Sequence, residues 1–183
     1  NALSQDQAGN AGTETPATTT SLPSPEQLEE LVGRMALYPD DLIGIILPAS
    51  TFPLQVVQAV RYLKLHDADP ALPADDEWDD SIVALLNYPE VLQMMDTDLD
   101  WTWELGTAVL NQEAEVMNAI QRFRQRAFAA GNLVSDDKQI VSNEGGAIVI
   151  RSADPEVLYI PSYEPEEVIV YQSRPVYRYY PVA

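Results

Sequence analysis

The sequence contains no cysteine and a single histidine, and these absences exclude several chemistries. Without thiols the chain has no disulfide, no thiolate nucleophile and no cysteine-ligated zinc site. A Ser-His-Asp triad would have to use His66, and there is no G-x-S-x-G turn to present the serine. The Gly145-Gly146 pair lacks the G-K-[ST] signature of a phosphate-binding loop. We therefore predict no catalytic residue and no cofactor.

Positive charge and long apolar runs are also scarce. Asp and Glu outnumber Lys and Arg by 29 to 10 in 183 residues, giving a formal net charge of −19, which repels nucleic acid and anionic lipid. From Leu65 to Gln121 there are fourteen acids and no Lys or Arg. The longest apolar run, residues 42–49, is far shorter than the roughly 18 residues of a membrane helix. We predict no transmembrane segment and no nucleic-acid partner.

Three arginines, Arg122, Arg124 and Arg126, follow the acidic stretch directly. Two interpretations remain open at this point. The first is an acidic zone beside a basic patch, which suits a polar partner surface. The second is a solvated face with cations near a helix C-terminus, where they interact favourably with the helix dipole.

Residues 1–23 are rich in Ala, Gly, Ser, Thr, Pro and amide side chains and show no apolar periodicity. Such a segment buries too little apolar area to offset an ordering cost of about 1–2 kcal/mol per residue, so we predict a low-complexity tail. The composition after Asn1 is typical of a mature chain from which a signal peptide has been removed. We therefore expect export to the periplasm or cell envelope, and leave open a lost lipid anchor before Asn1.

Proline and capping residues divide the next part of the chain into short helices. Ser24-Pro25 predicts the start of the first helix, and Tyr38-Pro39 its end. We expect a second helix over residues 40–47, followed by a third that Ser50 or Thr51 caps.

Two further helices are expected over residues 80–87 and 89–96, before the longest one, which runs from Leu99 to about Ala129 and ends at Gly131. Its apolar residues recur with roughly helical spacing, and this pattern predicts the buried face. The predicted stripe consists of Leu99, Trp103, Leu110, Met117, Ile120 and Phe128.

After the long helix the apolar period changes from 3.6 to 2, which indicates strands. We predict a hairpin turning at residues 144–146 and short strands over 156–163 and 167–173. The expected fold is α+β, mainly α, with a compact multi-helix body over 24–133 that includes one long helix. A small β appendage of short antiparallel strands over 138–172 and a Tyr/Arg-rich extended tail over 173–183 complete the chain.

Two acidic clusters raise the question of a metal site, D-D-E-W-D-D at residues 75–80 and D-T-D-L-D at residues 96–100. The run D-T-D-L-D at residues 96–100 begins like an EF-hand loop, but the sixth and twelfth positions, which need glycine and a bidentate acid, are Trp101 and Thr107. Thr97 and Asp100 instead have the spacing of a helix capping box. We predict no metal site, with weak candidates Asp79, Asp80, Asp98 and Asp100.

Aromatic and arginine residues are the candidates for an interface. Trp101 and Trp103 lie about 200° apart around a helix, so one is expected in the core and the other at the surface. The C-terminal tail combines Tyr and Arg without acids, which is typical of interface anchors and also of an edge strand within the chain's own appendage. The interface candidates are Trp78, Trp101, Arg174, Tyr177, Arg178, Tyr179 and Tyr180.

Four motifs occur in an order that carries a family likeness. They are A-L-Y-P-D from Ala36, P-x-x-V-x-x-A from Pro53, L-D-W-T from Leu99 and A-G-N-L from Ala130. Over about residues 25–171 the chain resembles the envelope family called domain of unknown function 3300. The resemblance implies an exported protein of Gram-negative bacteria. It supplies no catalytic or binding residues.

These observations together predict a non-enzymatic exported protein of the cell envelope. We expect it to act as a protein-protein interaction or assembly module, with either a protein partner or a second copy of itself. The alternative hypothesis is a periplasmic protein or hydrolase that binds a divalent cation or a glycan through its acidic loops.

Overall fold

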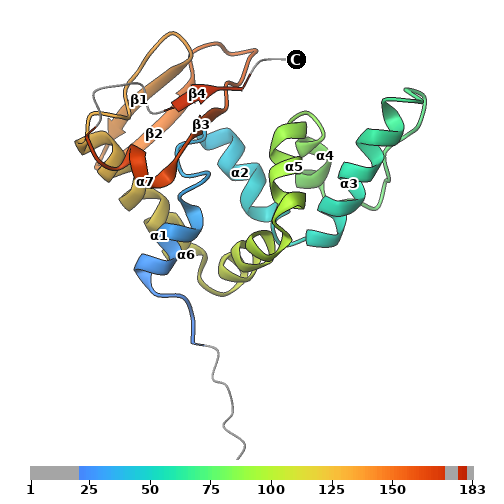
Figure 1. Ribbon diagram of the computed structural model, residues 1–183, viewed down its shortest axis with the longest axis horizontal. Helices are drawn as coiled ribbons and strands as arrows, with labels where there is room; N and C mark the ends of the chain where they lie inside the picture. Colours follow the sequence, from blue (N-terminus) through green and yellow to red (C-terminus); the bar gives the residue numbers. More distant parts are fainter. Residues whose placement is uncertain (1–20, 172–176, 181–183) are drawn as a thin grey trace, which may run out of the picture.

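The computed structural model describes residues 21–171 and 177–180, with helices first and strands last (Figure 1). The helical part consists of α1 (Pro25–Val32), α2 (Asp40–Ala49), α3 (Pro53–His66), α4 (Asp80–Leu85), α5 (Pro89–Thr97) and α6 (Leu99–Ala129). The rest consists of β1 (Gln139–Glu144), β2 (Ala147–Ser152), β3 (Pro161–Tyr163), α7 (Pro165–Val168) and β4 (Tyr177–Tyr179). The predicted α+β fold is confirmed. Most of both predicted tails lies outside the described residues.

Helix α1 begins as predicted but ends early. Ser24 and Gln27 form a capping box, in which the Ser24 hydroxyl accepts from the Gln27 amide and the Gln27 side chain accepts from the Ser24 amide. The helix ends at Val32 and not at residues 38–39. In the turns that follow, the backbone carbonyls of Ala36 and Tyr38 accept hydrogen bonds from the Arg124 side chain.

The junction between α2 and α3 differs from the prediction. The hydroxyls of Ser50 and Thr51 donate to the carbonyls of Leu47 at 2.6 Å and Pro48 at 2.7 Å, so they close α2. Helix α3 begins after Phe52, whose side chain makes no capping bond. The prediction that Ser50 or Thr51 caps α3 was wrong, because a hydroxyl can also satisfy the free carbonyls at the end of a helix.

The bounds predicted for α6 are confirmed, but the predicted buried stripe was wrong. Of its six residues only Ile120 is buried; the exposed ones are Leu99, Trp103, Leu110, Met117 and Phe128. Small residues lie on the inward face, where a Cβ added to Gly106 would meet the Ser50 carbonyl oxygen at 2.1 Å. Two helical segments meet at Gln112, whose backbone is non-helical (φ −154°, ψ 50°). Residues before and after this break therefore do not share one continuous face of the helix.

The predicted hairpin is confirmed. Strands β1 and β2 pair antiparallel, with Glu144 opposite Ala147, and Gly145 and Gly146 make the turn with φ of 63° and 92°. The later strands are shorter than predicted: β3 occupies only the end of 156–163, and 167–173 begins inside α7. The reason is Pro165, which sits in the first turn of α7, where proline is well tolerated. Strand β4 pairs antiparallel with β3.

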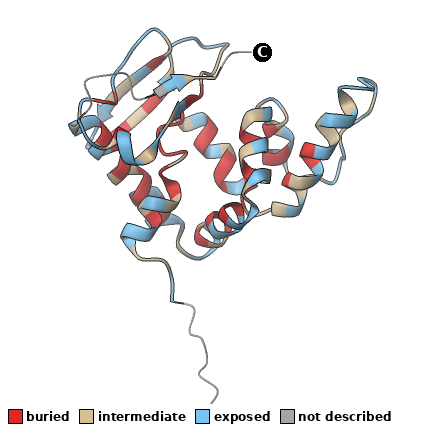
Figure 2. Cartoon of the chain, in the orientation of Figure 1, coloured by how far each residue is buried: buried red, intermediate tan, exposed pale blue. Residues whose placement is uncertain are grey.

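Long helix α6 connects the two ends of the molecule. It packs along α1 and against β2, while α3 and the loop after it lie at the end farthest from the strands (Figure 1). Buried residues concentrate where α2, α5 and α6 face one another (Figure 2). In the described part of the chain no single helix has the length and apolarity to cross a membrane; α2 and α3 reach them only as a pair bent by 110°.

Candidate functional surfaces

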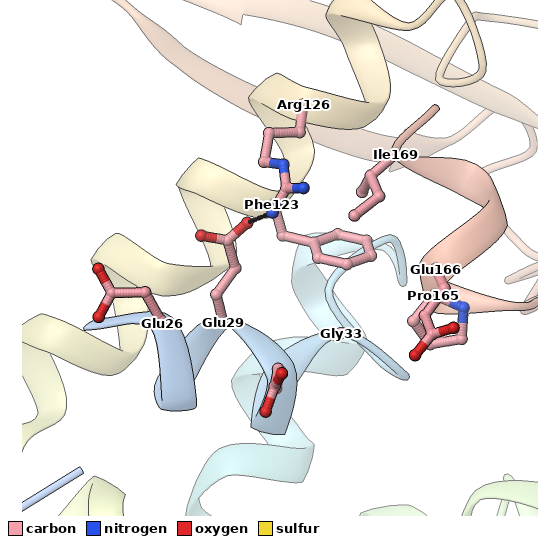
Figure 3. A pocket seen from close by; sticks show the side chains of 9 residues that line it. Glu26, Glu29, Gly33, Phe123, Arg126, Pro165, Glu166 and Ile169 are labelled. Atoms are coloured by element: carbon pink, nitrogen blue, oxygen red, sulfur yellow. Dashed lines mark hydrogen bonds and ion pairs between the residues drawn. The ribbon is translucent and has the colours of Figure 1, made fainter. Parts of the chain in front are cut away.

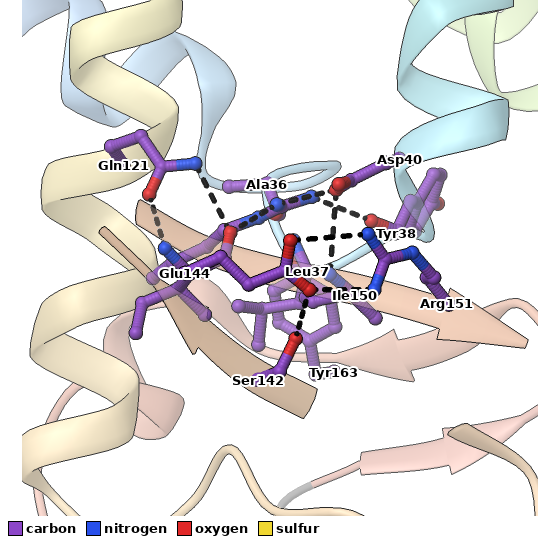
Figure 4. Close-up of polar contacts among 12 residues, drawn as sticks. Ala36, Leu37, Tyr38, Asp40, Gln121, Ser142, Glu144, Ile150, Arg151 and Tyr163 are labelled. Carbon is purple, nitrogen blue, oxygen red and sulfur yellow. Dashed lines mark hydrogen bonds and ion pairs between the residues drawn. The ribbon is translucent and has the colours of Figure 1, made fainter. Parts of the chain in front are cut away.

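Arg124 is the centre of a buried polar network that we call the Arg124 hub. The side chain is 2% exposed. Its Nη1 donates to the Asp40 carboxylate at 2.6 Å and to the Ile148 carbonyl at 2.8 Å, while Nε and Nη2 donate to the carbonyls of Ala36 at 2.7 Å and Tyr38 at 2.9 Å. Figure 4 shows the acceptor residues Ala36, Tyr38 and Asp40 over the hairpin and beside α6. The hub joins α6 to β2 and to the start of α2.

Two buried tyrosines extend this network. The Tyr163 hydroxyl donates to the Gly33 carbonyl at 2.5 Å and accepts from the Leu37 amide at 3.1 Å. Burial raises the pKa of Tyr163 well above its ordinary value of 10.0, and burial likewise raises the pKa of Tyr38. Both phenols therefore stay protonated; the Tyr163 hydroxyl holds the turn between α1 and α2, and the Tyr38 hydroxyl donates to the Met94 sulfur in α5 at 3.6 Å. Their role in this arrangement is structural.

The two remaining arginines of the predicted basic patch are engaged with α1. Arg122 and Arg126 pair with the Glu29 carboxylate at 3.6 Å and 2.5 Å. Together with the Arg124 hub, this places all three arginines in contacts within the fold. The basic patch beside the acidic stretch is thus largely neutralised by the chain itself.

A small cleft lies beside the Glu29–Arg126 pair, between α1, α6 and α7 (Figure 3). Phe123 and Ile169 provide an apolar floor, and the carboxylates of α1, with that of Glu166, line its rim. Its volume of about 270 Å³ is below the range of about 300–1,000 Å³ typical of small-molecule sites. It suits one side chain of a partner better than a cofactor.

The weak metal candidates are used as helix caps or lie in first helical turns. Asp79 accepts from the Ser81 amide at 2.9 Å and caps α4. Asp98 accepts from the Trp101 amide at 3.0 Å, which, with Arg34 at 3.1 Å, lowers the pKa of Asp98. The candidates in first turns are Asp80 in α4 and Asp100 in α6. Within residues 21–171 and 177–180, no group of three metal-ligating side chains is placed to hold an ion.

This arrangement also corrects the predicted cap of α6. Asp98, and not Thr97, is the capping residue, because the Thr97 hydroxyl donates to the Gln93 carbonyl at 2.6 Å in the last turn of α5. Thr97 therefore closes one helix and Asp98 opens the next.

The two tryptophans of α6 have opposite environments, as predicted. Trp101 is 6% exposed; its indole nitrogen donates to the Leu31 carbonyl at 2.7 Å, and the Arg34 guanidinium lies 4.6 Å from the ring centre. Trp103 is 61% exposed. The choice of Trp101 as an interface candidate is therefore corrected: its ring belongs to the core, and Trp103 carries the exposed ring.

Trp103 lies on an exposed apolar row in the first segment of α6, which we call the Trp103 face. It consists of Leu99, Trp103 and Leu110, spaced four and seven residues apart, so they share one side of the helix. Leu110 is 73% exposed. Asp100 and Glu104 flank the row, inside the stretch without Lys or Arg. Sequence reasoning put these residues on one apolar stripe with Ile120 and left open which of Trp101 and Trp103 lies at the surface.

Trp78 lies in a groove between α3 and the loop after it, at the end of the molecule farthest from the strands. We call it the Tyr62–Trp78 groove; its volume is about 670 Å³. The Trp78 indole donates to the Gln58 side chain at 3.3 Å, and its ring meets Tyr62 edge-on at 5.6 Å between ring centres. Trp78 is thus partly buried and remains part of an open surface.

The C-terminal strand β4 pairs with the chain's own strand β3. Of the tail candidates, the structure describes Tyr177, Arg178, Tyr179 and Tyr180, whereas Arg174 lies outside the described residues. The Tyr179 hydroxyl donates to Asp136 at 2.7 Å, and the Tyr180 amide donates to the Ile160 carbonyl at 2.9 Å. The β4 part of the tail is accordingly a strand of its own appendage, with Arg178 exposed.

These features define the class: a helical domain closed by short strands, held by a buried arginine, with acidic and apolar surfaces. The profile of the family described as "Protein of unknown function (DUF3300)" matches residues 24–183, and the chain belongs to this family. It is 31% identical over 191 residues to the "Uncharacterized protein YacH" of Escherichia coli (strain K12). The match covers 84% of the chain but 31% of that relative's length. No solved structure matches.

Proposed function

We propose that the chain is a non-enzymatic protein-interaction domain of an exported cell-envelope protein, and that the Trp103 face is its binding surface. The observation that carries this proposal is the exposure of Trp103 and Leu110, 61% and 73%, on one side of a helix. Tryptophan is strongly enriched among the residues that dominate binding energy at protein interfaces. Burying such a row on a partner contributes about 25 cal/mol of favourable free energy per Å² of apolar area removed from water.

The charge around the Trp103 face indicates the kind of partner. No Lys or Arg occurs between residues 65 and 121, and Asp100 and Glu104 flank the row. A partner that covers this face must offer apolar side chains with Lys or Arg around them, because like charges facing each other across an interface are unfavourable. A second copy, itself carrying a net charge of −19, matches this requirement poorly.

The proposed location has separate support. Its motifs resemble those of an envelope family. Fractionation of native cells, with protease added before and after the outer membrane is opened, tests the location. We expect digestion only after opening. A protein recovered with the cytoplasm would contradict export without bearing on the Trp103 face.

Site-specific photo-crosslinking in native cells tests the binding surface. A photoreactive phenylalanine replaces Trp103 in the full-length protein, and in a matched strain it replaces Tyr171, which is 80% exposed on the other part of the fold. We expect a discrete crosslinked species from position 103 and none of the same mass from position 171. Equal crosslinking at both positions, or none at 103, would refute the Trp103 face as an interface.

A further inference from the structure

The Tyr62–Trp78 groove presents ring surface together with carboxylates. The polar atoms of its aromatic residues are already used, since the Tyr62 hydroxyl donates to the Leu72 carbonyl at 3.0 Å and the Trp78 indole donates to Gln58. What the groove offers a ligand is therefore the rings, the apolar edge of Leu72, and the exposed Asp75 and Asp76. Its volume of about 670 Å³ lies within the range of ligand-binding sites.

The charge of the groove favours a cation. The loop and turn over residues 67–80 contain seven acids and no Lys or Arg. Arg61 is the one cation among the lining residues, which also include Asp75 and Asp76, and the same loop carries five further acids. Field lines from such a cluster concentrate positively charged ligands near the surface.

Rings beside carboxylates suit one ligand chemistry in particular. A guanidinium is planar, stacks on tryptophan or tyrosine faces, and pairs with carboxylates through two parallel hydrogen bonds. Proline in an extended helix also docks into grooves lined by aromatic rings, at low entropic cost because the segment is already extended.

We propose that the Tyr62–Trp78 groove binds an extended segment of a partner protein that carries arginine next to proline. An arginine of the segment stacks on Trp78 and pairs with Asp75 or Asp76, and a neighbouring proline lies against Leu72 and Tyr62. The inference rests on the proposed function only in that the ligand is again a protein. The surface is different from the Trp103 face, so each can fail alone.

Fluorescence anisotropy with a labelled dodecapeptide of alternating arginine and proline tests this site on the purified 183-residue chain. The matched peptide has glutamine in place of every arginine. We expect saturable binding of the arginine peptide and at least about tenfold weaker binding of the glutamine peptide. Trp78→Ala should weaken binding about tenfold, whereas Trp103→Ala, which removes another exposed tryptophan, should leave it unchanged.

A second pair of variants separates the groove from net charge. Asp75→Asn/Asp76→Asn and Glu113→Gln/Glu115→Gln each remove two exposed carboxylates, but only the first pair lines the groove. We expect the first double variant to lose several-fold in affinity and the second to bind like the parent. All four residues are at the surface, so both variants should retain the circular dichroism and unfolding midpoint of the parent.

Four results would overturn the proposal. These are absence of binding, equal binding of the two peptides, equal loss in the Trp78 and Trp103 variants, and equal loss in the two double carboxylate variants. Sedimentation of the chain alone completes the test. A dimer that Trp78→Ala dissolves would identify a second copy as the occupant and refute a separate partner. Failure of these assays together with crosslinking at position 103 would remove the groove and leave the proposed function standing.

Discussion

At the residue scale, the structure depends on a cation that the sequence places among surface charges. Arg124 lies in the run R-F-R-Q-R, where three arginines at alternating positions suggest a solvated helix end. Its neighbours on the same side of the helix, Ile120, Phe123 and Ala127, are apolar, and this is the sequence signal that could have identified it. A buried guanidinium is retained only where its donors are satisfied, here by three carbonyls and one carboxylate.

Removing Arg124 should cost much more stability than removing its neighbour. Arg124→Ala leaves the carbonyls of Ala36 and Tyr38 without their side-chain donor and leaves Ile148 with Gln121 alone, so we expect a loss of about 3–5 kcal/mol in the free energy of unfolding. Arg126 is itself exposed, and Arg126→Ala leaves Glu29 paired with Arg122 at 3.6 Å, so it should cost less than about 1 kcal/mol. Urea unfolding measures both. Equal losses would mean that the hub contributes no more than a surface ion pair.

Stability should depend on pH in the alkaline range because of Tyr38 and Tyr163. Burial raises the pKa of both phenols in the folded state, so above pH 10 the unfolded chain releases protons that the folded chain keeps. Their contribution is complete below about pH 10 and is lost as pH rises further, at about 1.4 kcal/mol per pH unit for each group.

Urea unfolding between pH 8 and 11 checks this dependence. Tyr38→Phe/Tyr163→Phe should be less stable at pH 8, since hydroxyl bonds are lost, and should show a shallower fall above pH 10. Tyr171→Phe, at an 80% exposed position, should keep the slope of the parent. An unchanged slope in the double variant would show that other groups cause the alkaline loss.

At the element scale, α6 shows why the strongest pattern in the sequence was misassigned. Large apolar residues recur at helical spacing on its exposed side, yet the inward face mixes large residues with small ones, because α6 approaches the α2–α3 junction backbone to backbone at Gly106. Close approach between elements leaves no trace in hydrophobic periodicity. The break at Gln112 also changes which residues share a face before and after it, so one apolar stripe cannot describe the whole helix.

Substitution by alanine should change stability in opposite directions at two helical glycines. Gly106→Ala places a Cβ 2.1 Å from the Ser50 carbonyl oxygen, so α6 must move and we expect a loss of more than about 3 kcal/mol. A Cβ at Gly44 in α2 meets nothing within 4 Å, and Gly44→Ala should stabilise by about 0.5–1 kcal/mol through helix propensity. Urea unfolding gives the sign of each. A tolerated Gly106→Ala would contradict the close packing.

Local signals were reliable where backbone chemistry alone decides the structure. The Ser24 cap, the Gly145-Gly146 turn and the bounds of α6 were all predicted, because each depends on residues close in sequence. The end of α1 was mispredicted because a distant group, Arg124, binds two carbonyls of the turns that follow. The cap of α6 was mispredicted because neighbouring residues compete: the Thr97 hydroxyl bonds to the Gln93 carbonyl in α5, which leaves the cap to Asp98.

At the scale of the whole molecule, charge and exposed apolar area combine on one region. The 14 acids between residues 65 and 121 include those beside the Trp103 face and those of the Tyr62–Trp78 groove, whereas all described ion pairs except that of Asp98 involve acids outside this stretch. The helical half therefore presents a negative field that its own cations do not neutralise. A cationic partner would relieve this repulsion on binding, and so would dissolved salt.

Salt should accordingly stabilise the free domain. Raising sodium chloride from about 0.01 to 0.1 M shortens the Debye length from about 30 to 10 Å, which screens the repulsion within a chain of net charge −19. We expect the thermal midpoint to rise by about 2–4 °C, which corresponds to about 1 kcal/mol of added stability in a chain of this size. A variant with Asn at Asp67, Asp69, Asp75 and Asp76 should show a smaller rise, because it removes four of the repelling charges. A midpoint that falls with salt would mean that ion pairs such as Glu29–Arg126 outweigh the repulsion of the acidic half.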